Sequence, residues 1–144
     1  MVLRNQADLL YSQYVEEYHS FDLLHDSKGK LDVIGLGVYH YPEYLVHLRR
    51  SFENITICLF EDMKHKPDLF WGQISALLGK KVTPKHENQK RKSPEGYYTK
   101  QGVLVPYFPE AKKAEIMSWY NNERLVEWGI SRERLVEYGY LPKV

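Results

Sequence analysis

Residues 55–60 limit the fold of this chain more than any other segment. They form a nearly continuous apolar run, Ile-Thr-Ile-Cys-Leu-Phe, in which Thr56 is the one polar side chain. A strand with one face in water alternates apolar and polar residues, whereas a strand of a parallel sheet is covered on both faces and does not. The run therefore predicts a buried strand of a parallel sheet, and a strand at 1–3 that leads directly into a helix favours the same α/β class.

Helix signals surround this strand. Asn5 is a favourable N-cap for a helix over 6–18, and Pro42 and Pro67 suit the first turns of helices over 42–52 and 67–78. Apolar spacing assigns the buried faces of the last two helices to Leu45, Leu48 and Phe52, and to Phe70, Ile74, Leu77 and Leu78. Residues 20–37 and 80–108 are expected to be loops.

The end of the chain contains a near-duplication. Residues 123–129 and 133–139 share the pattern Glu-Arg-Leu-Val-Glu followed by an aromatic residue and glycine. A period of ten residues is too short for a helical repeat unit. We therefore predict a helix from Pro109 and then two short helices, each ended by its glycine.

Composition indicates one globular domain over residues 1–144, with 43% hydrophobic and 27% charged positions. Cys58 is the single cysteine and cannot form an intrachain disulfide, so the cytoplasm is the expected location. No apolar run approaches the roughly 20 residues that cross a bilayer, and no signal-peptide pattern is found, so no membrane partner is expected. The six histidines lack the spacing of known metal motifs, and we expect no metal site.

Positive charge is concentrated in residues 80–100, which hold seven basic and two acidic side chains in a chain of net charge +1. Such a run is either a solvated loop or a site that attracts phosphate or sulfate. Nucleic acid is an unlikely partner because the twelve tyrosines do not alternate with basic residues on strands. RNA binding through the basic run is the weaker alternative.

Arg4 and Ser12 are the candidate binding residues. Arg4 ends the predicted first strand, where ligands of open α/β sheets bind beside the free amides of helix N-termini. Its guanidinium can hold a phosphate through two parallel hydrogen bonds, and Ser12 can add a hydroxyl. In the alternative interpretation, Arg4 pairs with Asp8 and Ser12 is an ordinary surface residue.

Residues 3–14, Leu-Arg-Asn-x-x-Asp-x-x-Tyr-Ser-x-Tyr, resemble the segment of PAPS-dependent sulfotransferases that binds the 3′-phosphate of the nucleotide donor. In that segment an arginine ends a strand and a serine follows eight residues later, which is the spacing of Arg4 and Ser12. Further segments resemble the family in the same order along the chain: Gly37-x-Tyr39, Arg49 to Phe52, Ile57 to Met63, Lys66 to Asp68, Leu77 to Gly79, and Ala114 to Tyr140.

The resemblance implies a helix-rich, partial P-loop-like α/β domain with a small parallel sheet remnant, similar to the C-terminal half of a sulfotransferase. It implies PAPS or its product PAP as the bound nucleotide, and sulfuryl transfer to a hydroxyl or amine acceptor. Arg4 and Ser12 would hold the 3′-phosphate, and Lys90, Arg91 and Lys92 would cover it. The family's arginine-lysine-glycine triplet is not reproduced there, because Ser93 and Pro94 follow.

The family's 5′-phosphosulfate loop has no counterpart, since no G-x-x-x-x-G-K-[ST] motif occurs among the 144 residues. The catalytic residues are therefore unknown. Two interpretations stay open. The first is a sulfotransferase or a fragment of one, with a second copy of the chain or a missing N-terminal half as a candidate partner. The second is a non-catalytic nucleotide- or partner-binding module.

Overall fold

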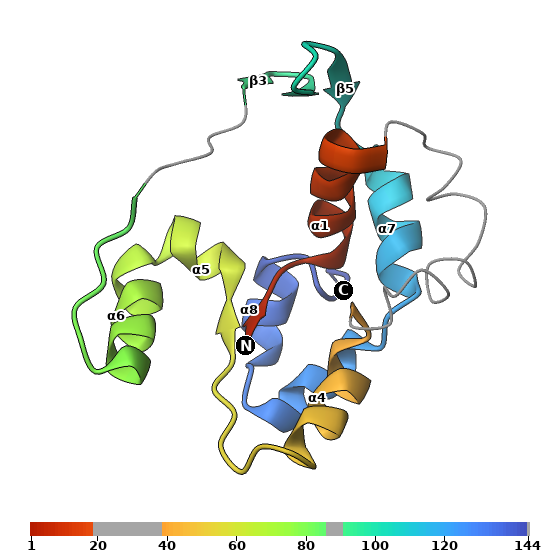
Figure 1. The fold of residues 1–144 in the computed structure, drawn as a ribbon. Helices are drawn as coiled ribbons and strands as arrows, with labels where there is room; N and C mark the ends of the chain where they lie inside the picture. Colours follow the sequence, from red (N-terminus) through yellow and green to blue (C-terminus); the bar gives the residue numbers. More distant parts are fainter. Residues whose placement is uncertain (19–38, 86–90, 144) are drawn as a thin grey trace.

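The computed structural model describes residues 1–18, 39–85 and 91–143 (Figure 1). The predicted loop at 20–37 lies entirely outside these ranges. The helices are α1 (Gln6–Gln13), the π-helix η1 (Tyr14–Tyr18), α4 (Tyr41–Arg49), α5 (Phe60–His65), α6 (Pro67–Leu78), α7 (Glu110–Ser118), the 3-10 helix η3 (Asn122–Trp128) and α8 (Arg132–Glu137). The strands are β1 (Val2–Leu3), β2 (Cys58–Leu59), β3 (Lys92–Ser93), β4 (Gly96–Tyr98) and β5 (Leu104–Pro106).

The parallel sheet consists of β1 and β2, with Val2 opposite Cys58 and Leu3 opposite Leu59. The mixed, helix-rich α/β class is confirmed, but the strand predicted over 55–60 is reduced to two residues. β1 ends at Leu3 because Asn5 already caps α1, and α5 begins at Phe60. The short β1 therefore leaves little backbone for a longer strand to pair with.

Two apolar clusters form the core. The first joins β1, β2, α4, η3 and α8, and its fully buried members include Leu3, Leu45, Leu59, Leu125 and Leu135. The second lies among α1, α7 and β5, with members that include Leu10, Tyr11, Val105, Phe108 and Ile116. Figure 1 shows α1 beside α7, and the start of α1 beside the C-terminal segment. Helix α1 is thus supported by elements from the last third of the chain.

The prediction of a structureless segment over 80–108 is wrong, because residues 92–106 contain the antiparallel sheet β3-β4-β5. Its strands have only two or three residues each, which is too short for an apolar period to be visible. At Gly96 a Cβ atom would overlap the carbonyl oxygen of Val105 on the neighbouring strand, so the close approach of β4 to β5 requires glycine.

The helix boundaries agree better with the sequence than the buried faces do. Gly79, Gly129 and Gly139 adopt the left-handed conformation after α6, η3 and α8, which confirms their predicted role as helix ends. The predicted burial of Phe52, Leu77 and Leu78 is wrong, since their exposed fractions are 57%, 56% and 59%. Phe52 follows the end of α4, and α6 packs mainly on α5, which leaves its C-terminal turn uncovered.

Within the described ranges, we find no helix with the length and apolar character needed to cross a membrane.

Candidate functional site

Arg4 lies between the carboxyl end of β1 and the first turn of α1, as the sequence predicts. Its backbone is held by Tyr41, whose hydroxyl donates to the Arg4 carbonyl oxygen at 2.7 Å. Its guanidinium carbon lies 4.6 Å from the centroid of the Phe60 ring. Among the described residues Arg4 forms no ion pair with Asp8, so the alternative interpretation of Arg4 is not supported. A cation stacked on a ring keeps its N–H edge for an anion.

Ser12 lies in the second turn of α1 and is half-buried. A helix rises 1.5 Å per residue, so Ser12 is about 10 Å along the axis from the Asn5 cap. Arg4 and Ser12 therefore belong to one rigid strand-helix unit. A phosphate shared by both residues would have to lie along the side of α1, within reach of the long Arg4 side chain.

The amides at the start of α1 are already occupied, which corrects the expectation that they are free for a ligand. The Asn5 side-chain oxygen accepts from the amides of Ala7 and Asp8 at 3.0 and 3.3 Å. The amide of Asn5 itself donates to Glu61 Oε1 at 2.7 Å. The protein therefore places its own carboxylate at this helix end, and an anion beside Arg4 would depend mainly on side chains.

Of the basic segment, Lys90 lies outside the described residues, while Arg91 and Lys92 are exposed at the first strand of the antiparallel sheet. The guanidinium carbon of Arg91 is 4.4 Å from the Tyr98 ring centroid. The sheet is attached to α1 by Tyr11, whose hydroxyl donates to the Val105 carbonyl at 2.6 Å and accepts from the Tyr97 amide at 2.9 Å. Figure 1 shows the sheet at the C-terminal end of α1. Tyr11, the residue before Ser12, thus attaches β4 and β5 to α1. Lys92 is on β3, which pairs with β4 in the same sheet.

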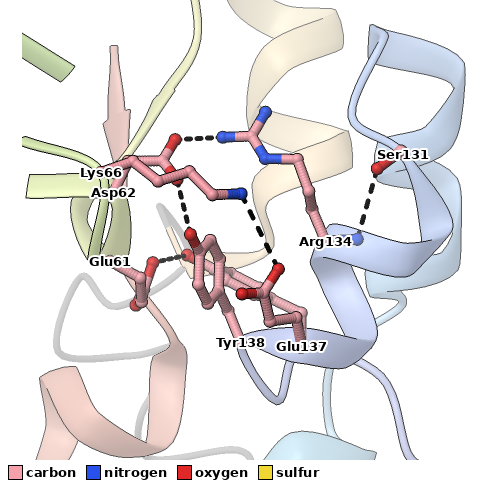
Figure 2. Close-up of polar contacts among 8 residues, drawn as sticks. Glu61, Asp62, Lys66, Ser131, Arg134, Glu137 and Tyr138 are labelled. Atoms are coloured by element: carbon pink, nitrogen blue, oxygen red, sulfur yellow. Dashed lines mark hydrogen bonds and ion pairs between the residues drawn. The ribbon is translucent and has the colours of Figure 1, made fainter. Parts of the chain in front are cut away.

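A buried polar network, which sequence analysis missed, supports the start of α1. Asp62 is completely buried, and its carboxylate accepts from the Tyr138 hydroxyl at 2.7 Å and from the Arg134 guanidinium (Figure 2). The adjacent Glu61 accepts from the Tyr140 hydroxyl at 3.0 Å. The two consecutive acidic residues after the strand were the available signal, but nothing local identified their partners in the C-terminal helix.

A second buried contact joins α1 to η3. The side-chain amides of Gln6 and Asn122 exchange two hydrogen bonds, of 2.9 and 3.0 Å, and both side chains are excluded from water. Asn122 also donates to the Tyr140 carbonyl at 3.2 Å. The position of α1, and with it that of Arg4 and Ser12, therefore depends on the C-terminal helices.

Burial raises the pKa of Glu61 above its ordinary value of 4.5, against the hydrogen bonds from Asn5 and Tyr140 that lower it. When the pKa of a carboxyl is higher in the folded than in the unfolded state, its protonated form stabilises the fold. This contribution is complete below the unfolded-state pKa and is lost as pH rises through the folded-state pKa. We therefore expect Glu61→Gln to gain in unfolding free energy relative to the wild type as pH is raised from about 4 to about 7.

Urea unfolding of both proteins across this pH range measures the difference, with the exposed Glu53→Gln as a matched control. Glutamine keeps an acceptor for the Asn5 amide and can donate to the Tyr140 hydroxyl. A difference between Glu61→Gln and the wild type that does not change with pH would contradict the assigned burial effect.

The described residues contain no group of three or more histidine, cysteine, aspartate or glutamate side chains placed to hold a metal ion. Comparisons with protein-family models, with curated proteins and with solved structures find no match to this chain.

Proposed function

We propose that this chain binds the 3′-phosphate of PAPS or PAP and is the donor-binding portion of a P-loop-like sulfotransferase. Arg4 and Ser12 would hold the phosphate, and the strand of Arg91 and Lys92 would close over it. The full reaction would transfer the sulfuryl group from PAPS to a hydroxyl or amine acceptor. Such catalysis consists mainly of positioning and charge stabilisation, so the missing phosphosulfate loop leaves the isolated chain without most of it.

The double hydrogen bond of Tyr11 is the observation that carries this proposal. It joins the helix of Ser12 to the sheet of Arg91 and Lys92, two segments that are far apart in the sequence and that the resemblance assigns to one phosphate. The stacking of Arg4 on Phe60 adds support, since it leaves guanidinium N–H groups unused by any ion pair among the described residues. Arginine is well suited to such a phosphate contact because its donors are planar and permanently charged.

The alternative is a module that binds the nucleotide without catalysis, and the absent phosphosulfate loop motif favours it. Both interpretations require the same 3′-phosphate site, so binding tests the site and turnover separates the two. Turnover of labelled PAPS by the isolated chain would support the enzyme, while PAP binding without turnover would support the module.

We expect Arg4→Ala to weaken PAP binding by about 1.5–3 kcal/mol, the range for a hydrogen bond to a charged group. Isothermal titration calorimetry with PAP measures the effect. Arg132→Ala is the matched control, because Arg132 is an exposed arginine of α8 paired with Glu123 and should leave the affinity unchanged. Equal PAP affinity in the wild type and Arg4→Ala would refute the phosphate site.

Adenosine 5′-monophosphate, which differs from PAP only in lacking the 3′-phosphate, serves as a ligand control. It should bind the wild type more weakly than PAP, and Arg4→Ala should remove that difference. A preference for PAP that survives in Arg4→Ala would place the 3′-phosphate at other residues.

A further inference from the structure

Helices α4 and η3 pack against each other and border a cavity of about 360 Å³. Figure 1 shows the two helices side by side, with α4 in orange and η3 in blue. The cavity is lined by Val46, Arg49 and Arg50 from α4 and its end, and by Glu127 and Trp128 from η3. None of these residues takes part in the proposed phosphate site. The volume lies in the lower part of the range of ~300–1,000 Å³ typical of small-molecule sites.

Arg49 is oriented by an aromatic ring. Its guanidinium carbon lies 4.4 Å from the centroid of the Trp128 ring, a cation–π distance. Stacking fixes the plane of the guanidinium and leaves the N–H groups at its edge as donors. The stacking therefore restricts the rotamers of the Arg49 side chain and orients its guanidinium to bind a planar anion.

The charge of the cavity is positive. Within the part of the chain that the structure describes, neither Arg49 nor Arg50 has a carboxylate at ion-pair distance. The acid in the lining, Glu127, is 3.6 Å from Arg124, which is also 3.6 Å from Glu43. Two arginines against this one acid leave the lining with a net positive charge. Cations are favourable at the end of α4, where the last carbonyl groups point, but that effect requires neither the stacking on Trp128 nor the cavity beside it.

The remaining lining is apolar. Val46 is 41% exposed, and the indole of Trp128 extends the apolar wall. We propose that this cavity binds a small organic carboxylate, with the carboxylate held by Arg49 and Arg50 and a flat apolar body against Val46 and Trp128. Two guanidinium groups match a carboxylate through paired hydrogen bonds, and the apolar wall discriminates against an inorganic anion.

Benzoate is the probe, and its binding to the full chain is measured by calorimetry and by tryptophan fluorescence. We expect saturable binding that the Arg49→Gln/Arg50→Gln double variant weakens by about tenfold or more, since each charged hydrogen bond contributes about that factor. The matched control Arg132→Gln, on α8, should bind benzoate as the wild type does. Inorganic phosphate should bind at least about tenfold more weakly than benzoate, because it cannot use the apolar wall.

Arg49→Lys provides a second variant that keeps the charge but loses the planar fork, and it should also weaken benzoate binding. The proposal is overturned if the wild type shows no saturable binding of benzoate, if the double variant binds it equally well, or if phosphate binds as tightly. Circular dichroism of the variants verifies that these exposed arginines are replaced without unfolding.

Discussion

Arg134→Met is expected to lower the unfolding free energy by about 3 kcal/mol, near the lower end of the cost of removing one partner from a buried ion pair. Asp62 has 0% of its side chain exposed, while Arg134 retains 29%. The variant removes the guanidinium of Arg134, so the buried Asp62 carboxylate keeps the Tyr138 hydroxyl as its one side-chain donor among the described residues. The partial exposure of Arg134 keeps the loss at the lower end of the range.

Arg132→Met is the matched control on the same helix. Arg132 also pairs with a carboxylate, that of Glu123, but both side chains are about half exposed, at 48% and 55%. Exposed pairs contribute about 0–1 kcal/mol, so the two variants should differ by at least about 2 kcal/mol in urea unfolding. Equal losses for Arg132→Met and Arg134→Met would show that the burial of Asp62 has no energetic consequence.

The two arginines also show what the sequence could and could not reveal. They lie two residues apart on α8, and only Arg134 belongs to the repeated motif of 133–139. Nothing in the local sequence distinguishes the buried ion pair of Arg134 from the surface ion pair of Arg132. The partner of Arg134 is 72 residues away, and the partner of Gln6 is 116 residues away. Helix caps and glycine ends are local features and were predicted, whereas pairings over such separations depend on the tertiary fold.

In the candidate site too, the sequence predicts the local features but not the contacts between residues far apart in the chain. The location of Arg4 after a strand, the Asn5 cap and the helix of Ser12 all come from short-range patterns. The Glu61 carboxylate at the Asn5 amide, and the sheet that Tyr11 attaches to α1, required the structure. The exposed Leu77 and Leu78 mark the opposite error, in which a regular apolar period predicted a buried face that no element covers among the described residues.

Asn122→Leu is expected to lower the unfolding free energy by about 2–6 kcal/mol, because two buried acceptors lose a donor and each loss costs about 1–3 kcal/mol. The acceptors are the side-chain oxygen of Gln6 and the carbonyl of Tyr140. The exposed neighbour Asn121→Leu should stay within about 0.5 kcal/mol of the wild type.

The double variant Gln6→Leu/Asn122→Leu should cost less than the sum of its two single variants, by about 1–3 kcal/mol, because no amide is then left facing an apolar partner. Urea unfolding of the four proteins gives this coupling energy, and strict additivity would show that the two amides act independently. PAP titration of the same proteins extends the argument to function. If the C-terminal helices position Arg4 and Ser12 through this contact, the single variants should weaken PAP binding and the double variant should recover part of it.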